Sequence, residues 1–218
     1  MLKTQAFPTP GSRPRGRALH ASGSALRRVQ RLHGAAFARC ILGVDPGLHT
    51  TGYGVIEVAK PSDRAQSSRG PVRCATTSAL RLLEGGVLKA KAADSLPLRL
   101  QTLHDALADV LREYKPDVVV VEELFSTYAH PRSALLLAQA RGVLVLAAQQ
   151  SGAAVHSFTP NEVKQVVAGN GHATKSAMQQ AVRTRLKLAT APNPPDVADA
   201  LGLALCYAAR QDLGEMLD

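Results

Sequence analysis

The feature that most restricts the possible folds of this chain is a run of four consecutive valines, residues 118–121, between Asp117 and Glu122. Successive side chains of a β-strand point to opposite faces, so four apolar neighbours in a row require both faces to be buried. Strands of this kind occupy the middle of parallel sheets that helices cover on both sides. The valine run therefore predicts an α/β domain with a central strand that ends at Glu122.

A second apolar segment also ends in a carboxylate. Residues 41–44 precede Asp45, and the following Pro46-Gly47 cannot extend a strand. Asp45 is therefore predicted to lie at the carboxyl edge of a buried strand. By itself, an aspartate in this position is also typical of a simple turn.

The remaining patterns complete a sheet with helices around it. Leucines at helical spacing predict a helix over 96–115, and Thr159 before Pro160 predicts a helix N-cap. Further strands are expected at 50–58, 72–83 and 153–158, and further helices at 131–150, 160–168, 174–188 and 194–210. This order predicts an α/β fold with a mixed five-stranded sheet flanked by helices.

The net charge of +9 is concentrated near the N-terminus, where residues 1–40 hold one lysine and seven arginines without any acid. The rest of the chain is nearly neutral, so a DNA-binding surface on it requires local segregation of charge. We expect a disordered basic leader over 1–38, one folded domain over 39–212 and a tail over 213–218. The leader fits a transit peptide, a phosphate-binding arm or, as we favour, a start codon placed too far upstream.

Other features of the sequence restrict the cellular compartment in which the protein could work. The cysteines at positions 40, 74 and 206 are odd in number and form no C-x-x-C pair, which argues against a disulfide framework or structural zinc. No apolar run is long enough to predict a membrane span. A reducing compartment fits these observations best.

Four carboxylates from three distant segments are predicted to meet. Asp45 and Glu122 end strands that the topology can place side by side, and ligand sites of open α/β sheets lie at such strand ends. Asp196 and Asp199 share one face of the last helix. Either residue also has a structural explanation, as a partner of the helix dipole or as a surface charge. However, this helix is mostly apolar, so we expect Asp199 to face a compensating group.

Clustered carboxylates repel one another unless they are protonated or bridged by cations. Oxygen ligands without His or Cys select Mg²⁺ or Mn²⁺. Two such ions can activate a water and stabilise the leaving oxygen of an in-line phosphodiester displacement. The pattern therefore suggests metal-dependent hydrolysis of nucleic acid.

The ordered motifs resemble the RuvC family of bacterial Holliday-junction resolvases, within the RNase H-like nuclease superfamily. The resemblance covers residues 40–210 and rests on ILGVDPG with TGYGV, VEELF, LAQARG, VKQ with GNG and Lys175, and PDVADAL. It implies an RNase H-like fold and a metal-dependent endonuclease that resolves Holliday junctions by paired symmetric nicks in DNA recombination and repair. Asp45, Glu122, Asp196 and Asp199 would be its catalytic and metal-binding acids.

The resemblance also implies DNA contacts and partners. Lys164 and Lys175 match basic positions associated with the junction, although they also fit solvated helix charges, and Phe125 matches an aromatic position beside the scissile region. The family implies two Mg²⁺ per site, with Mn²⁺ as a substitute, four-way junction DNA as substrate, a homodimer, and cooperation with the RuvA–RuvB branch-migration complex. A bacterial cytoplasmic location is expected, or an organelle if residues 1–38 are a transit peptide.

Two residue-level expectations follow from position. The helix over 133–149 is apolar on more than one face, which fits either an isologous dimer or a helix buried within one subunit. Phe125 follows Glu122 where the chain leaves the sheet, which favours a ring that stacks on an exposed base over a core ring.

Rival functions have weaker support. Asp45-x-Gly47 with Thr50-Thr51-Gly52 also resembles the first phosphate loop of actin-like ATPases and sugar kinases, but the chain has no room for their second loop and domain. A binding protein without catalytic activity would lack one of the four acids, and none of them is missing from this sequence. A ribonuclease H acting on RNA–DNA hybrids is the best enzymatic alternative, and the apolar 133–149 helix argues against it.

Overall fold

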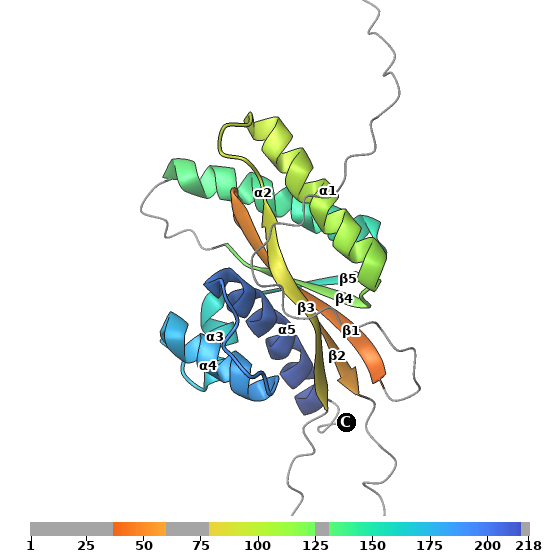
Figure 1. Cartoon of the computed structure of the whole chain (residues 1–218), viewed down its shortest axis with the longest axis vertical. Coiled ribbons are helices and arrows are strands. Elements are labelled where there is room, and N and C mark those ends of the chain that lie inside the picture. The colour runs from red at the N-terminus through yellow and green to blue at the C-terminus, as the bar shows by residue number, and fades with distance from the viewer. Residues whose placement is uncertain (1–36, 60–78, 125–130, 215–218) are drawn as a thin grey trace, which may run out of the picture.

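The computed structural model describes residues 37–59, 79–124 and 131–214. These residues form a five-stranded sheet with the order β3-β2-β1-β4-β5 (Figure 1). β1 pairs antiparallel with β2 and parallel with β4, so the predicted mixed sheet is confirmed. The strands are β1 (Phe37–Asp45), β2 (Thr50–Ala59), β3 (Leu80–Lys89), β4 (Val118–Glu122) and β5 (Ala154–Phe158).

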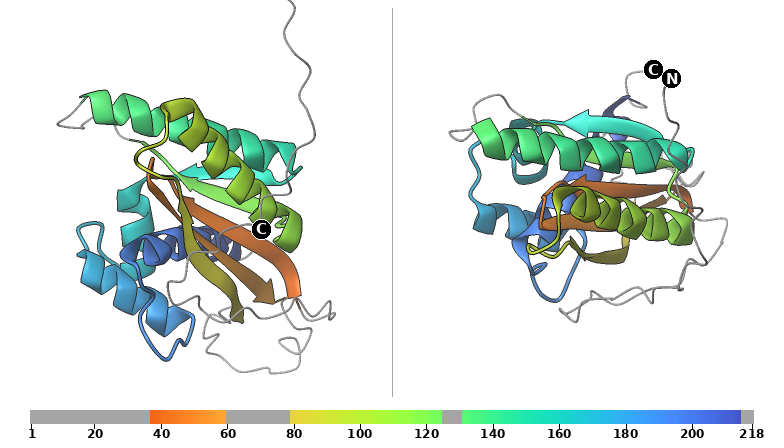
Figure 2. Two further views of the ribbon diagram at one scale, coloured as in Figure 1. Left: turned by 45° about the horizontal axis from the view of Figure 1, so that its top comes forward. Right: turned by 90° about the horizontal axis from the view of Figure 1, so that it is seen from above.

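Helices cover both faces of the sheet. The helices are α1 (Leu96–Tyr114), α2 (Pro131–Gln150), α3 (Pro160–Ala168), α4 (Lys175–Arg185) and α5 (Pro195–Gly214). Figures 1 and 2 show α1 and α2 on one face, and α3, α4 and α5 on the other. Within the described ranges, no helix is long and apolar enough to cross a membrane.

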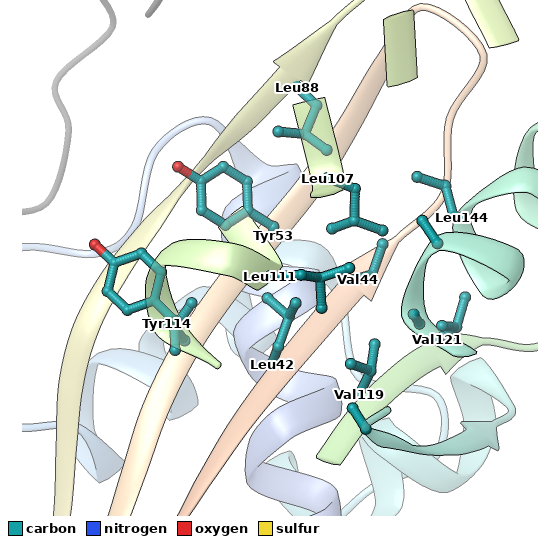
Figure 3. Close-up of a cluster of buried hydrophobic side chains, with 14 of the residues drawn as sticks. Leu42, Val44, Tyr53, Leu88, Leu107, Leu111, Tyr114, Val119, Val121 and Leu144 are labelled. Carbon is teal, nitrogen blue, oxygen red and sulfur yellow. The ribbon is translucent and has the colours of Figure 1, made fainter. Parts of the chain in front are cut away.

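The valine run lies at the centre of this three-layer arrangement. Val119 and Val121 pack into the core beneath α1 and α2, which Figure 3 shows, whereas Val118 and Val120 pack into the core beneath α3, α4 and α5. All four side chains are buried, so the prediction of a strand covered on both faces is confirmed. The acids that flank the valines fix the register of β4, because a shift by one residue would carry Asp117 or Glu122 into an apolar core.

Glycines allow α5 to lie unusually close to the sheet. A Cβ atom at Gly43 of β1 would be 1.9 Å from the carbonyl oxygen of Ala200, and one at Gly52 of β2 would be 2.1 Å from that of Asp196. Real Cβ atoms essentially never come within 3.0 Å of such atoms. The backbone of α5 therefore takes the space that side chains on β1 and β2 would otherwise fill.

The third strand differs from its prediction. Residues 72–83 were expected to form it, whereas β3 runs from Leu80 to Lys89, and residues 72–78 lie outside the described part of the chain. Gly85-Gly86 is typical of a turn, yet these residues pair with Gly54 and Tyr53 of β2. A Cβ at Gly86 would be 2.8 Å from the Tyr53 hydroxyl, so the second glycine gives room to the Tyr53 ring.

Hydrogen bonds to the partly buried Glu84 connect β3 to β2 and α1. The Tyr53 hydroxyl donates a hydrogen bond to Glu84 Oε1 at 2.7 Å, and the Tyr114 hydroxyl donates to the other oxygen of the same carboxylate. Figure 3 shows both hydroxyls pointing to the same side of the core. Burial and the Glu84 charge raise the pKa of Tyr53 far above its ordinary value, which keeps this hydroxyl a donor.

Candidate active site

Two carboxylates meet at one edge of the sheet. β1 ends at Asp45 and β4 ends at Glu122, and the parallel register pairs Val44 with Val121, the residues just before them. The two carboxyl groups share a hydrogen bond. The predicted convergence of these two strand ends is therefore present in the structure.

A buried threonine stabilises the turn after Asp45 by hydrogen bonds. The Thr51 hydroxyl donates to the carbonyl oxygen of Gly47 at 2.8 Å and accepts from the Gly47 backbone N–H at 3.1 Å. Thr51 is fully buried. Because one hydroxyl satisfies both backbone groups of Gly47, the turn has a defined shape directly after the carboxylate.

The start of α5 brings the other two acids to the same edge. Asp45 pairs with Gly52 across β1 and β2, and Gly52 is the residue against which the backbone of Asp196 lies. Asp199 follows one turn later on α5. The charges of Asp196 and Asp199 both raise the pKa of Asp45, so these carboxylates lie within electrostatic reach of it.

The site is strongly acidic and partly desolvated. Burial, together with the charges of Glu122 and Asp199, raises the pKa of Asp45 to about 9. Burial also raises the pKa values of Glu122 and Asp199, which repel each other. Without bound cations, these carboxyl groups therefore keep protons in the folded protein at pH values at which they lose them in the unfolded chain.

This donor set fits a hard divalent cation. Oxygen ligands and excess negative charge are what Mg²⁺ and Mn²⁺ require. Within the described residues, no group of three or more Asp, Glu, His and Cys side chains has an arrangement that could hold a metal ion. Mg²⁺ does not require three such side chains, because it is usually held by one or two carboxylates together with waters and substrate phosphates.

Two lysines from the helical face of the site lie beside the acids. The charges of Lys164, on α3, and Lys175, at the start of α4, both lower the pKa values of Glu122 and Asp199. The predicted Thr159 N-cap of α3 is confirmed, with a capping box to Glu162. The structure thus brings both predicted lysines to the carboxylates, whereas Phe125 lies outside the described residues.

Sequence reasoning missed three supporting features of the site. Thr51 and Gly52 were considered as parts of a strand, of the TGYGV motif and of a possible phosphate loop, and Arg141 as part of the LAQARG motif, but none of them for a contact that shapes the site. The close Gly52–Asp196 approach joins residues 144 positions apart. No local pattern predicts such a contact, although several glycines within two strand patterns are a usable sign of close backbone approach.

Comparisons with known proteins identify one family. The family model described as crossover junction endodeoxyribonuclease RuvC matches residues 41–207. The RuvC of Rhodopirellula baltica is 43% identical over 182 residues, which cover 83% of this chain and 93% of that protein. The RuvC of Thermomicrobium roseum is 41% identical over 167 residues, with coverages of 77% and 91%.

Solved structures extend the comparison to the fold. Thermus thermophilus RuvC superposes with a TM-score of 0.67 at 32% identity, covering 80% of this chain and 96% of that one. The same protein in complex with a Holliday junction substrate gives 0.67, with coverages of 81% and 97%. The predicted RNase H-like fold is thereby confirmed. With its family match and these relatives, the chain belongs to the RuvC family of crossover junction endodeoxyribonucleases.

Proposed function

We propose that this protein resolves Holliday junctions by nicking two symmetric DNA strands with the acids at the end of β1, at the end of β4 and at the start of α5. Membership of the RuvC family makes it a nuclease, and T. thermophilus RuvC has been solved with a Holliday junction substrate. The observation that carries the residue assignment is geometric: the pairing of β1 with β4 and the packing of the Asp196 backbone against Gly52 bring the ends of both strands and the start of α5 to one edge of the sheet.

These four acids would hold the divalent cations, two Mg²⁺ per site, with Mn²⁺ as a substitute. Bound there, the cations activate water and stabilise the leaving oxygen of the phosphodiester. The protein supplies the carboxylates in a fixed geometry through the Thr51-locked turn and the close approach of α5. Lys164 and Lys175 add positive charge where a phosphate would lie between the helices and the acids.

A cleavage assay with three substrates tests this function. We expect Mg²⁺-dependent cutting of a four-way junction in preference to a matched linear duplex and an RNA–DNA hybrid. Glu122→Gln should abolish cutting, because the amide keeps the shape but loses the charge that holds Mg²⁺. Asp109→Asn, an exposed acid of α1 that pairs with Arg112, is the matched control. Preferential cutting of the hybrid would favour the ribonuclease H alternative, and full activity in EDTA would reject the metal mechanism.

Family membership also underlies the proposed setting of this reaction. We propose cooperation with the RuvA–RuvB branch-migration complex and a bacterial cytoplasmic location.

Phe125 remains a predicted stacking residue beside the scissile step, on the basis of its position three residues after Glu122. Phe125→Ala should then slow cutting strongly while the melting temperature stays nearly constant.

The two lysines are expected to contact DNA phosphates. Changing Lys164 or Lys175 to alanine should weaken junction binding for all sequences and reduce the slope of log affinity against log salt by about one unit each. Binding titrations in EDTA at several salt concentrations measure this slope without cutting. Arg112→Ala, on α1 at the opposite face of the sheet, should leave the slope unchanged. Unchanged slopes in the lysine variants would identify them as solvated helix charges.

α2 carries an outward apolar stripe that fits a second copy of the chain. Leu135 is 66% exposed and Leu146 is 50% exposed. Ala138 and Gly142 lie between them at helical spacing, and nothing lies within 4 Å of a Cβ built at Gly142. Small residues between leucines allow two helices to approach closely, and a two-fold axis would give one site for each of two symmetric DNA strands. We therefore propose a homodimer through α2.

Sedimentation of a charged variant tests this dimer. Leu146→Glu should convert a dimer at micromolar concentration into a folded monomer, because the charge would be desolvated at the interface while the free helix face tolerates it. Leu98→Glu, at a leucine of α1 with a similar exposure of 47%, should sediment as the wild-type protein does. A monomeric wild-type protein that still cuts both strands of a junction would contradict the proposal.

A further inference from the structure

One arginine joins α2 to the ends of two strands. Arg141 Nε donates a hydrogen bond to the backbone carbonyl oxygen of Glu122 at 2.8 Å, and Arg141 Nη2 donates to Ser157 Oγ at 2.6 Å. Glu122 is the last residue of β4, and Ser157 is the penultimate residue of β5. Because the guanidinium group is planar and rigid, its two bonds hold both strand ends in a fixed relation to α2.

These bonds act at the end of β4, where Glu122 is still paired with Phe158 of β5. β4 ends at this residue, and the last backbone bond to β5 runs from Glu123 N–H to the Phe158 carbonyl at 2.9 Å. The Glu122 carbonyl receives its bond from Arg141 instead. The carbonyl and the side chain of Glu122 leave the same residue, so a bond that holds the carbonyl limits the rotation of the Glu122 backbone. The point and direction from which the Glu122 side chain extends are thereby restricted.

We propose that Arg141 is a positioning residue that orients the Glu122 carboxylate for metal binding. The inference rests on the proposed role of Glu122 in holding the cation. Arg141 acts through the backbone, since both of its hydrogen bonds go to a carbonyl and a hydroxyl rather than to the acids themselves. A metal ligand needs to be held to within about 0.5 Å, and the bond from Arg141 adds a restraint on the Glu122 carbonyl to those that the pairing with Phe158 provides.

Three variants separate positioning from general stability. Arg141→Gln removes the two-pronged contact, Arg141→Lys keeps the charge but not the fork, and Ser157→Ala removes one of the two bonds. Arg112→Gln, an exposed arginine of α1 that pairs with Asp109, is the matched control. For each protein we would measure single-turnover junction cutting against Mg²⁺ concentration, junction affinity in EDTA, and the rise in melting temperature caused by Mg²⁺ alone.

We expect Arg141→Gln to slow cutting by a factor on the order of 10–100, because small displacements of a catalytic group have effects of that size. Its half-saturating Mg²⁺ concentration should rise, and the Mg²⁺-induced increase in melting temperature should shrink. Junction affinity in EDTA should stay at the wild-type value. Arg141→Lys and Ser157→Ala should lie between Arg141→Gln and wild type, and Arg112→Gln should match wild type.

Wild-type Mg²⁺ dependence of both cutting and melting in Arg141→Gln would overturn the proposal. So would a loss of junction affinity with a normal Mg²⁺ response, because Arg141 would then be a DNA contact. If the wild-type protein failed to cut junctions, the proposed substrate would be rejected. The effect of Mg²⁺ on melting would still test Arg141 in that case. Ser157→Ala keeps the test available should Arg141→Gln not fold.

Discussion

Replacing Gly43 by alanine should both destabilise the protein and inactivate it. The added Cβ would lie 1.9 Å from the Ala200 carbonyl oxygen and 3.0 Å from the Ala204 backbone nitrogen, so backbone atoms of α5 would have to move. Overpacking of a core typically costs about 1–3 kcal/mol of unfolding free energy, and a rigid backbone neighbour places this site at the upper end. Displacing α5 by about 1 Å should also slow cutting on the order of 100-fold, because α5 carries Asp196 and Asp199.

Chemical denaturation and junction-cutting rates on the same variant check this expectation. Gly171→Ala is the control for unfolding, since the atoms nearest to its Cβ would lie 3.6 Å and 3.7 Å away, which is ordinary van der Waals contact. The same substitution should therefore be tolerated at Gly171 and destabilising at Gly43. A Gly43→Ala protein with wild-type stability and activity would show that α5 does not depend on this close approach.

Replacing Asp45 by asparagine should abolish cutting and yet stabilise the metal-free protein. Burial and neighbouring acids raise the pKa of Asp45 to about 9, compared with an ordinary value of 3.8. The folded state therefore retains a proton that the unfolded chain releases, so stability falls as the pH rises from 3.8 through about 9. Asparagine has no proton to lose, and we expect a gain on the order of 1–3 kcal/mol at pH 8 in EDTA.

Melting temperatures between pH 5 and pH 9 in EDTA measure this difference. The gap between Asp45→Asn and wild type should widen with pH, and Mg²⁺ should narrow it, because cations replace the retained proton in wild type. Asp109→Asn, at an exposed acid, should show no such widening. A wild-type protein that becomes more stable than Asp45→Asn as the pH rises in EDTA would contradict the proposed electrostatics.

Local sequence determined the centre of the sheet and two of the site positions. Four valines in a row require burial on both faces, and they form β4 between two cores. Pro46-Gly47 after an apolar strand places Asp45 at a strand end, as observed. These predictions succeed because strand alternation and the restricted backbone of proline act over a few neighbouring residues.

The bounds of β3 depended on the tertiary structure. Gly85-Gly86 favours a turn when it is considered alone, but pairing with β2 and the space needed by the Tyr53 ring keep both glycines within the strand. Cross-strand pairing and packing outweigh a local turn preference of this size. The prediction of a third strand was therefore correct in kind and wrong at its C-terminal limit, which is Lys89 rather than Leu83.

The geometry of the site was also decided by contacts distant in sequence. The apolar pattern of α5 indicated that Asp199 needs a compensating group, and the charges of Lys175 and Lys164 oppose the rise that burial causes in its pKa. The depth at which α5 lies depends on Gly43 and Gly52, and the orientation of the β4 end depends on Arg141. Such contacts join residues that are too far apart along the chain to leave a periodic signal in the sequence. They form because α2 and α5 pack on opposite faces of the sheet and reach the same edge of it.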